Sequence, residues 1–374
     1  MRIALYTHSI RSDWNHGNAH FLRGVVTELQ ARGHDVRVFE PERSWSTENL
    51  VRDHGPGALR DAQAAYPTIR ASLYRLGDHD LDQALGDVDL CLVHEWNEPW
   101  LVRAIGRYRA RSRRLKVLFH DTHHRSATAP STMAAYDLSH YDGVLAFGEV
   151  VRQIYLARGW ASRAFVWHEA ADVRVFRPRE EEEEGDLVWI GNWGDDERSR
   201  ELSRYLLEPA RALGIRTLVH GVRYPSQAVR ALRRAGVRFG GWLPNFRVPE
   251  VFARHRFTVH VPRRPYTEQL RGIPTIRPFE AMACGIPLIC APWEDSEGLF
   301  TPGRDYLLAT DEESMRRHML LLRDDAAARA ALAKHARSTI LARHTCAHRV
   351  DELLRIAVDL GATERPRPLQ GAPA

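Results

Sequence analysis

The segment RPFEAMACGIPLI, residues 277–289, carries the strongest structural signal in this 374-residue sequence. Pro278 suits the first turn of an α-helix and Gly285 suits the position after its last turn, so the segment predicts a helix of about two turns with Arg277 at its cap position. Apolar residues follow Gly285 at once and predict a strand. A short helix that leads directly into a strand is a repeating unit of parallel α/β sheets.

Similar units occur on both sides of this segment. Near the N-terminus, Ile3–Tyr6 predicts a buried strand, apolar residues recur at helical spacing from Phe21 to Leu29, and Val36–Phe39 predicts a second strand. Further strands are expected at residues 89–94, 116–120, 143–147, 164–168, 187–191, 217–220, 237–239, 258–261 and 287–290. The pattern predicts two successive Rossmann-like halves. In such sheets ligands bind outside the carboxyl ends of the strands, so polar residues at those ends are candidates for function.

Composition limits the possible classes of protein. The 374 residues exceed one typical core and suit two domains, and 44% hydrophobic with 27% charged residues is usual for a globular protein. No run approaches ~18 apolar residues, so we expect no signal peptide, no membrane span and a cytoplasmic location. Four cysteines without metal-ligand spacing are expected to be buried free thiols, and no metal site is expected. The net charge of +5 fits an anionic ligand such as a nucleotide diphosphate, and equally a weak attraction to nucleic acid or acidic lipid.

Several segments, taken in their order along the chain, resemble bacterial-type GT-B glycosyltransferases of family 4 and of the CgeB-like group. Phe279–Ile289 is similar to the donor-binding helix and the strand after it. Residues 167–178 resemble the segment between the domains, and residues 237–252 resemble the loop that receives the nucleotide base. The regions 306–323 and 344–349 resemble the C-terminal helices.

The resemblance implies the GT-B fold, which is two Rossmann-like, doubly wound parallel-sheet domains that face a central cleft. Residues 1–172 would bind the acceptor and residues 173–345 the nucleotide sugar. Residues 346–361 would form a helix that crosses back to the first domain. Residues 362–374, rich in proline, arginine and glycine, are expected to be a disordered tail.

The resemblance also implies a donor site for a nucleotide-diphosphate sugar of the UDP or GDP type, with no further cofactor. Glu280 would accept hydrogen bonds from the ribose diol; the alternative is that it only complements the positive end of its helix. Family 4 enzymes often carry another glutamate where this sequence has Gly272, so the sequence lies nearer the CgeB-like branch. The residues expected to bind the donor are Gly17, Asn18, Arg198, Trp242, Leu243, Arg263, Gly272, Ile273, Pro274, Thr275, Arg277 and Glu280.

Arginines are expected to stabilise the departing diphosphate, because glycosyl transfer builds negative charge on it. Arg198 and Arg277 are the first candidates, and Arg263 with Arg264 the second. The alternative for Arg198 is a surface arginine paired with a neighbouring glutamate. Gly17 and Asn18 precede a helix N-terminus, where a backbone without Cβ can approach a diphosphate or the acceptor.

Two pairs of polar residues at strand ends are the candidates for catalysis. His120 closes a strand, as a histidine does in many family 4 enzymes, where it contacts the donor sugar. Asp121 could orient His120 or act on the acceptor. His94 and Glu95 close another strand, and either could serve as the base on the acceptor side.

The resemblance therefore implies a hexosyltransferase-type enzyme that transfers a sugar with retention of anomeric configuration and without a metal ion. A nucleotide-sugar 2-epimerase and a catalytically degenerate nucleotide-sugar-binding protein are the alternatives. Specific nucleic-acid binding is not expected, because the basic residues are dispersed and no recognition motif occurs. The acceptor is expected to be a small molecule or a glycan, bound by the loops 45–65 and 123–136.

Overall fold

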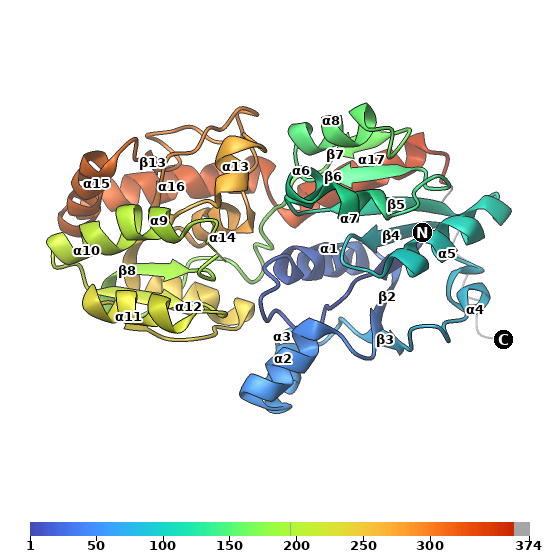
Figure 1. Ribbon diagram of the computed structural model, residues 1–374, viewed down its shortest axis with the longest axis horizontal. Helices are drawn as coiled ribbons and strands as arrows, with labels where there is room; N and C mark the ends of the chain where they lie inside the picture. The colour runs from blue at the N-terminus through green and yellow to red at the C-terminus, as the bar shows by residue number, and fades with distance from the viewer. Residues whose placement is uncertain (195, 363–374) are drawn as a thin grey trace, which may run out of the picture.

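The computed structural model describes residues 1–194 and 196–362 and contains two parallel β-sheets (Figure 1). The expected C-terminal tail lies, from residue 363 on, outside the described residues. The first sheet has the strand order β3-β2-β1-β4-β5-β6-β7, and the second has the order β10-β9-β8-β11-β12-β13. Every strand pairing in both sheets is parallel. We call the first sheet with its helices the first half, and the second sheet with its helices the second half.

The strand bounds follow the expected apolar runs closely. The first sheet holds β1 (Arg2–Tyr6), β2 (Asp35–Pro41), β3 (Ala71–Tyr74), β4 (Leu90–His94), β5 (Lys116–Asp121), β6 (Gly143–Ala146) and β7 (Ala164–Val166). The second holds β8 (Gly185–Ile190), β9 (Thr217–His220), β10 (Arg238–Phe239), β11 (His255–His260), β12 (Leu288–Cys290) and β13 (Leu307–Leu308). The predicted strands do not include β3, whose middle residues are exposed, or β13, which has only two residues.

Helices cover both faces of each sheet. In the first half these are α1 (Ala19–Ala31), α2 (Trp45–His54), α3 (Gly57–Ala65), α4 (Leu81–Leu85), α5 (Pro99–Arg111), α6 (Arg125–Thr128), α7 (Pro130–Ala134) and α8 (Glu149–Ala157). In the second half these are α9 (Ser199–Leu202), the π-helical turn Ser203–Leu207, α10 (Glu208–Ala212), α11 (Ser226–Arg234), the 3₁₀ turn Asn245–Arg247, α12 (Val248–Ala253), α13 (Arg264–Glu268), α14 (Ile276–Cys284), α15 (Glu312–Asp324) and α16 (Ala326–Arg343). Four buried apolar clusters, two in each half, fill the spaces between sheets and helices. This doubly wound arrangement confirms the fold class that the sequence predicts.

The helix predicted in segment 277–289 is α14, and it begins earlier than Pro278 suggests. Thr275 is the N-cap of α14, so Arg277 lies in the first turn and not at the cap position, and that part of the prediction is wrong. The helix ends before Gly285, as expected. All four cysteines are buried and free, which confirms the expectation for the thiols.

The last helix, α17 (Cys346–Asp359), returns to the first half and packs on α1 (Figure 1). The backbone N–H of Cys346 donates to the carbonyl of Ala171 at 3.0 Å, and the N–H of Ala171 donates to the carbonyl of His344 at 3.0 Å. The indole N–H of Trp167 donates to the carbonyl of Arg349 at 2.8 Å. The segment that leaves the first half and the segment that returns to it are thus joined to each other. The exact domain boundaries stay a prediction.

Across the described ranges, 1–194 and 196–362, no helix is both long enough and apolar enough to cross a membrane. In the same ranges, no group of three or more His, Cys, Asp or Glu side chains is arranged to hold a metal ion.

The close contact between α1 and α17 depends on Gly24. A Cβ built there would lie 2.5 Å from the Cys346 sulfur and 2.7 Å from the Asp172 Cβ. We expect Gly24→Ala to lower the free energy of unfolding by about 1–3 kcal/mol, because an added methyl group forces packed elements apart. Equilibrium urea unfolding measures this change.

Gly57→Ala is the matched control, since a Cβ there would have Arg60 as its nearest neighbour at 3.6 Å, an ordinary contact. Equal unfolding midpoints for the two variants would show that α1 and α17 are not packed this closely.

Candidate functional site

A cavity of about 620 Å³ lies between the two halves. Most of its lining residues lie at or after the carboxyl ends of the central strands β1, β4 and β5 in the first half, and of β8, β9 and β11 in the second half. The strand order reverses between β1 and β4 and between β8 and β11, and crevices at such switch points are where ligands bind in α/β sheets. The switch points of the two sheets therefore both border this cavity.

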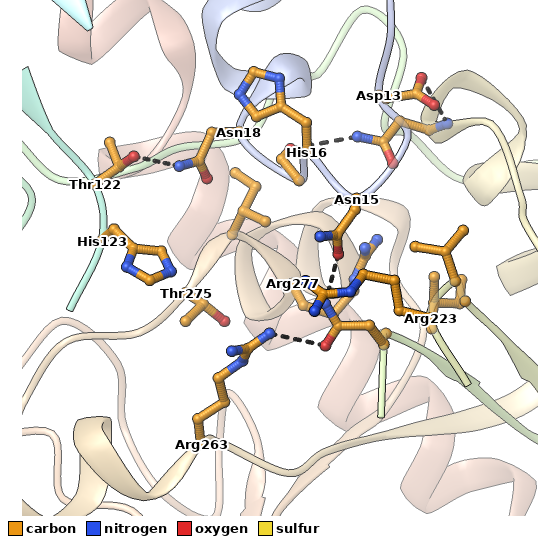
Figure 2. A pocket seen from close by; sticks show the side chains of 18 of the residues that line it. Asp13, Asn15, His16, Asn18, Thr122, His123, Arg223, Arg263, Thr275 and Arg277 are labelled. Carbon is orange, nitrogen blue, oxygen red and sulfur yellow. Dashed lines mark hydrogen bonds between the residues drawn. The ribbon is translucent and has the colours of Figure 1, made fainter. Parts of the chain in front are cut away.

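The second half contributes positive charge to the cavity. Arg198, Arg223, Arg263 and Arg277 line it, and Figure 2 shows the last three on the side opposite His16 and Asn18. Arg263 donates to Glu197 at 2.7 Å and to the amide oxygen of Asn192 at 2.9 Å. Four guanidinium groups around one space favour an anionic ligand.

Arg198 differs from most arginines of this protein in its partners. Its Nη1 donates to the carbonyl of Val261 at 3.0 Å, and its Nη2 donates to the carbonyl and side-chain oxygens of Asn192 at 2.7 and 3.0 Å. No carboxylate of the described residues pairs with it, and its Nε is buried without a partner there. Burial, together with the charge of Arg263, lowers the pKa of Arg198 to about 9. Arg198 is partly buried and its hydrogen-bond partners are all uncharged, so this group is placed to receive an anion.

Glu280 lies at the contact between the halves and does not line the cavity. Its Oε1 accepts from His20 Nδ1 at 2.8 Å, and its Oε2 accepts from Arg277. His20 Nε2 accepts from the backbone N–H of Asp172 at 2.9 Å, so its proton is on Nδ1. Phe176 stacks on His20 at 3.8 Å. The carboxylate of Glu280 thus ties α14 to α1, and its contact with a ribose stays a prediction.

Glu169, in the segment that joins the halves, is a carboxyl group to which the sequence analysis assigns no role. It lines the cavity, is 2% exposed, and its Oε1 has no partner among the described residues. Burial and the nearby carboxylates of Glu280 and Glu95 raise the pKa of Glu169 well above its ordinary value. This environment favours the protonated form of Glu169, and a protonated carboxyl group can donate a hydrogen bond into the cavity.

The first half contributes uncharged rings. His8 and His16 line the cavity with their rings 4.1 Å apart, and neither ring nitrogen of either side chain has a partner in the described part of the chain. Burial lowers the pKa of His8 to about 3 and that of His16 well below its ordinary value, so both are neutral at pH 7. Trp45 and Trp96 lie beside them.

Most of the expected donor-binding residues lie around this cavity. Those that line it are Gly17, Asn18, Arg198, Trp242, Leu243, Arg263, Thr275 and Arg277. Gly272, Ile273 and Pro274 do not line it. Gly272 has φ of 91°, and a Cβ there would collide with Ser296, so this backbone has no room for a glutamate at that position. Arg264 pairs instead with Glu201 at 3.1 Å.

The four expected catalytic side chains are buried behind the cavity wall. His120 packs against Trp167 with ring centres 4.8 Å apart, and burial lowers its pKa to about 3. Asp121 accepts from the Tyr155 hydroxyl at 2.9 Å, and burial raises its pKa well above the ordinary value. None of these four side chains lines the cavity, and their catalytic roles stay predictions.

Glu95 and His94 hold the loop that does reach the cavity. Glu95 accepts from the backbone N–H of Thr122 at 2.8 Å and from Arg125 at 2.8 Å. Thr122 in turn accepts from the side chain of Asn18 and lies 3.4 Å from His94 Nε2. After β4 and β5, the residues that line the cavity are Trp96 and Thr122, His123 and His124, so the expected residues lie one or two positions too early in the chain.

The comparisons with known proteins agree with this architecture. Residues 198–355 match the family model described as glycosyl transferase-like. No curated protein sequence matches the chain significantly.

Solved structures match nearly the whole chain. Anabaena Alr3699/HepE in complex with UDP has a TM-score of 0.66 at 12% identity, over 96% of this chain and 100% of that one. An alpha-glucosyltransferase in complex with UDP-glucose and DNA has 0.68 at 14% identity, over 96% and 99%. A glycosyltransferase from Rickettsia africae ESF-5 has 0.66 at 10% identity, over 96% and 98%. The whole chain thus has the GT-B fold, and its residues 198–355 match the glycosyl transferase-like family model.

Proposed function

We propose that this protein transfers a sugar from a nucleotide-diphosphate sugar of the UDP type to an acceptor, within the cavity between the two halves. The observation that carries the proposal is Arg198, a partly buried cation at the cavity wall whose hydrogen-bond partners are uncharged oxygens. A diphosphate supplies the missing negative charge. The UDP type is favoured because two of the similar structures contain UDP or UDP-glucose.

The diphosphate would lie between Arg198, Arg263 and Arg277. Thr275 occupies the N-cap position of the nine-residue helix α14, whose N-terminal backbone N–H groups add positive potential at the same wall. Negative charge grows on the diphosphate as its bond to the sugar lengthens, and fixed cations stabilise that state. These arginines supply the positive charge for the proposed step without a resident metal ion. Retention of configuration follows from the resemblance of the sequence to retaining families.

The nucleoside would lie toward Trp242 and Leu243, which line the cavity from the loop after β10. The indole N–H of Trp242 is buried and has no partner in the described residues. The sugar would then lie near the segment between the halves, where Glu169 is placed. A protonated Glu169 would donate a hydrogen bond to a sugar hydroxyl and so help to orient the sugar.

Calorimetric titration with UDP and GDP tests the donor site, and incubation with UDP-sugars tests the reaction. We expect UDP to bind the folded protein and a UDP-sugar to release UDP, slowly with water and faster with an acceptor. Conversion of the sugar of the donor without release of UDP would instead indicate an epimerase. Binding of UDP without any release would indicate a nucleotide-sugar-binding protein.

Arg198→Met should weaken UDP binding by about 1.5–3 kcal/mol, because a charged hydrogen-bond donor to the diphosphate is lost. Titration calorimetry at constant ionic strength measures the change. Arg200→Met is the control, since Arg200 is exposed and does not line this cavity. Equal UDP affinities for the Arg198 and Arg200 variants would remove Arg198 from the donor site.

Glu169→Gln should change how stability depends on pH. The folded state raises the pKa of Glu169, so between the unfolded and folded pKa values the folded state binds a proton that the unfolded state has lost. The wild-type protein therefore loses stability as pH rises through this window, by up to about 1.4 kcal/mol per pH unit. Glutamine carries no titrating proton and removes this slope.

Urea unfolding at pH 5 and pH 8 gives the free energies needed, and Glu169→Gln should gain on the wild type as the pH rises. Glu180→Gln in the exposed loop before β8 is the control and should follow the wild type. If the Glu169 variant also follows the wild type, Glu169 is ionised in the folded protein.

A further inference from the structure

The two sides of the cavity differ in their chemistry. Of the described residues that line it, every arginine comes from the second half, and the first half contributes neither arginine nor lysine. Figure 2 shows this division, with Asn15, His16 and His123 facing Arg223, Arg263 and Arg277. The arginines account for one anionic ligand. A second ligand, bound on the first half, meets a surface of another kind.

That surface consists of His8, His16, Trp45 and Trp96, and we call it the aromatic wall. His8 stacks on Trp45 with ring centres 5.5 Å apart and planes 10° apart, and it meets Trp96 edge-on at 6.2 Å. Trp45, the first residue of α2, is 38% exposed. The Trp14 ring packs edge-on against it, with ring centres 5.9 Å apart. An indole that stays exposed in a cavity offers an apolar face to a ligand.

Four ring nitrogens in the aromatic wall lack a partner among the described residues, two on His8 and two on His16. Both side chains are almost fully buried. A buried polar atom without a hydrogen bond costs about 1–3 kcal/mol, so the site is built to be satisfied by a ligand or by the water that a ligand displaces. Each neutral imidazole has one donor and one acceptor, and a hydroxyl group can serve both.

Charges near the aromatic wall are already neutralised by other groups. Asp13 pairs with Arg23 at 2.9 Å, and the guanidinium of Arg125 lies 4.0 Å above the Trp96 ring while it pairs with Glu95 at 2.8 Å. The wall therefore carries no net charge to attract an ionic acceptor. A phosphate chain would find no cation of the first half in this cavity.

We propose that the aromatic wall binds the acceptor and that the acceptor is a neutral carbohydrate. The C–H faces of a pyranose ring pack on Trp45 and Trp96, and its hydroxyl groups pair with His8 and His16. An aryl acceptor could stack on the indoles but would leave most of the four nitrogens unpaired. Nucleic acid is the acceptor class that this wall suits least. The assignment of this ligand as an acceptor rests on the proposed function, whereas its binding to the wall does not.

Saturation-transfer NMR with the full chain tests the wall directly. The probes are maltose, lactose, cellobiose and methyl α-D-mannopyranoside, with 4-nitrophenol and a duplex DNA oligonucleotide as competing classes, each with and without UDP. We expect at least one saccharide to bind. Trp45→Ala should weaken its binding about tenfold, because a stacking face is lost, and should leave UDP affinity unchanged.

His8→Leu is the second variant. It removes two unpartnered nitrogens, so it should keep or raise the melting temperature while it weakens saccharide binding. Trp100→Ala is the control, because Trp100 is 42% exposed on α5 and lies outside the cavity. It should bind saccharide and UDP as the wild type does.

The proposal is overturned if no saccharide binds, if Trp45→Ala and Trp100→Ala bind saccharide equally, or if 4-nitrophenol or DNA binds where the saccharides do not. Failure of the proposed function looks different. In that case UDP does not bind, or no UDP-sugar is turned over, while saccharide still binds to the aromatic wall.

Discussion

The positive charge of Arg198 is the constraint on which this account depends. The backbone after β8 and β11 supplies carbonyl oxygens that hold the guanidinium in place, but the described residues supply no carboxylate to neutralise it. Because Arg198 is partly buried and its hydrogen-bond partners are all uncharged, it is positioned to interact with an anionic ligand at the cavity wall. The aromatic wall on the opposite side of the cavity is uncharged. The cavity therefore has one side suited to an anion and one side suited to an uncharged ligand.

The cationic side and the aromatic wall face each other only while the two halves keep their relative position. Glu280 on α14 accepts from His20 on α1, and α17 carries the end of the described chain back across the first half. The Glu280 contact lies next to the cavity, because Arg277, which lines the cavity, also donates to Glu280. Glu280, which the family resemblance assigns to the ribose, thus also binds His20 of the first half. The contact between the halves and the proposed donor site therefore meet at α14.

Much of the fold could be predicted from the sequence, because apolar runs and helix signals are local. The position of Arg198, Arg263 and Arg277 at the cavity could also be predicted, since each lies next to a strand end or a helix start. The depth at which a side chain is buried could not be predicted. His120 and Asp121 are buried, whereas the loop after them reaches the cavity. Glu169 gives no local signal either, because its pKa depends on burial and on Glu280 and Glu95, which are distant in sequence.

A crystal structure of the protein with UDP tests the central claim most directly. The account predicts the diphosphate between the two halves, with a phosphate oxygen within hydrogen-bond distance of the Arg198 guanidinium and the uracil beside Trp242. UDP bound outside the cavity, or bound inside it with Arg198 still held only by Val261 and Asn192, would contradict the account.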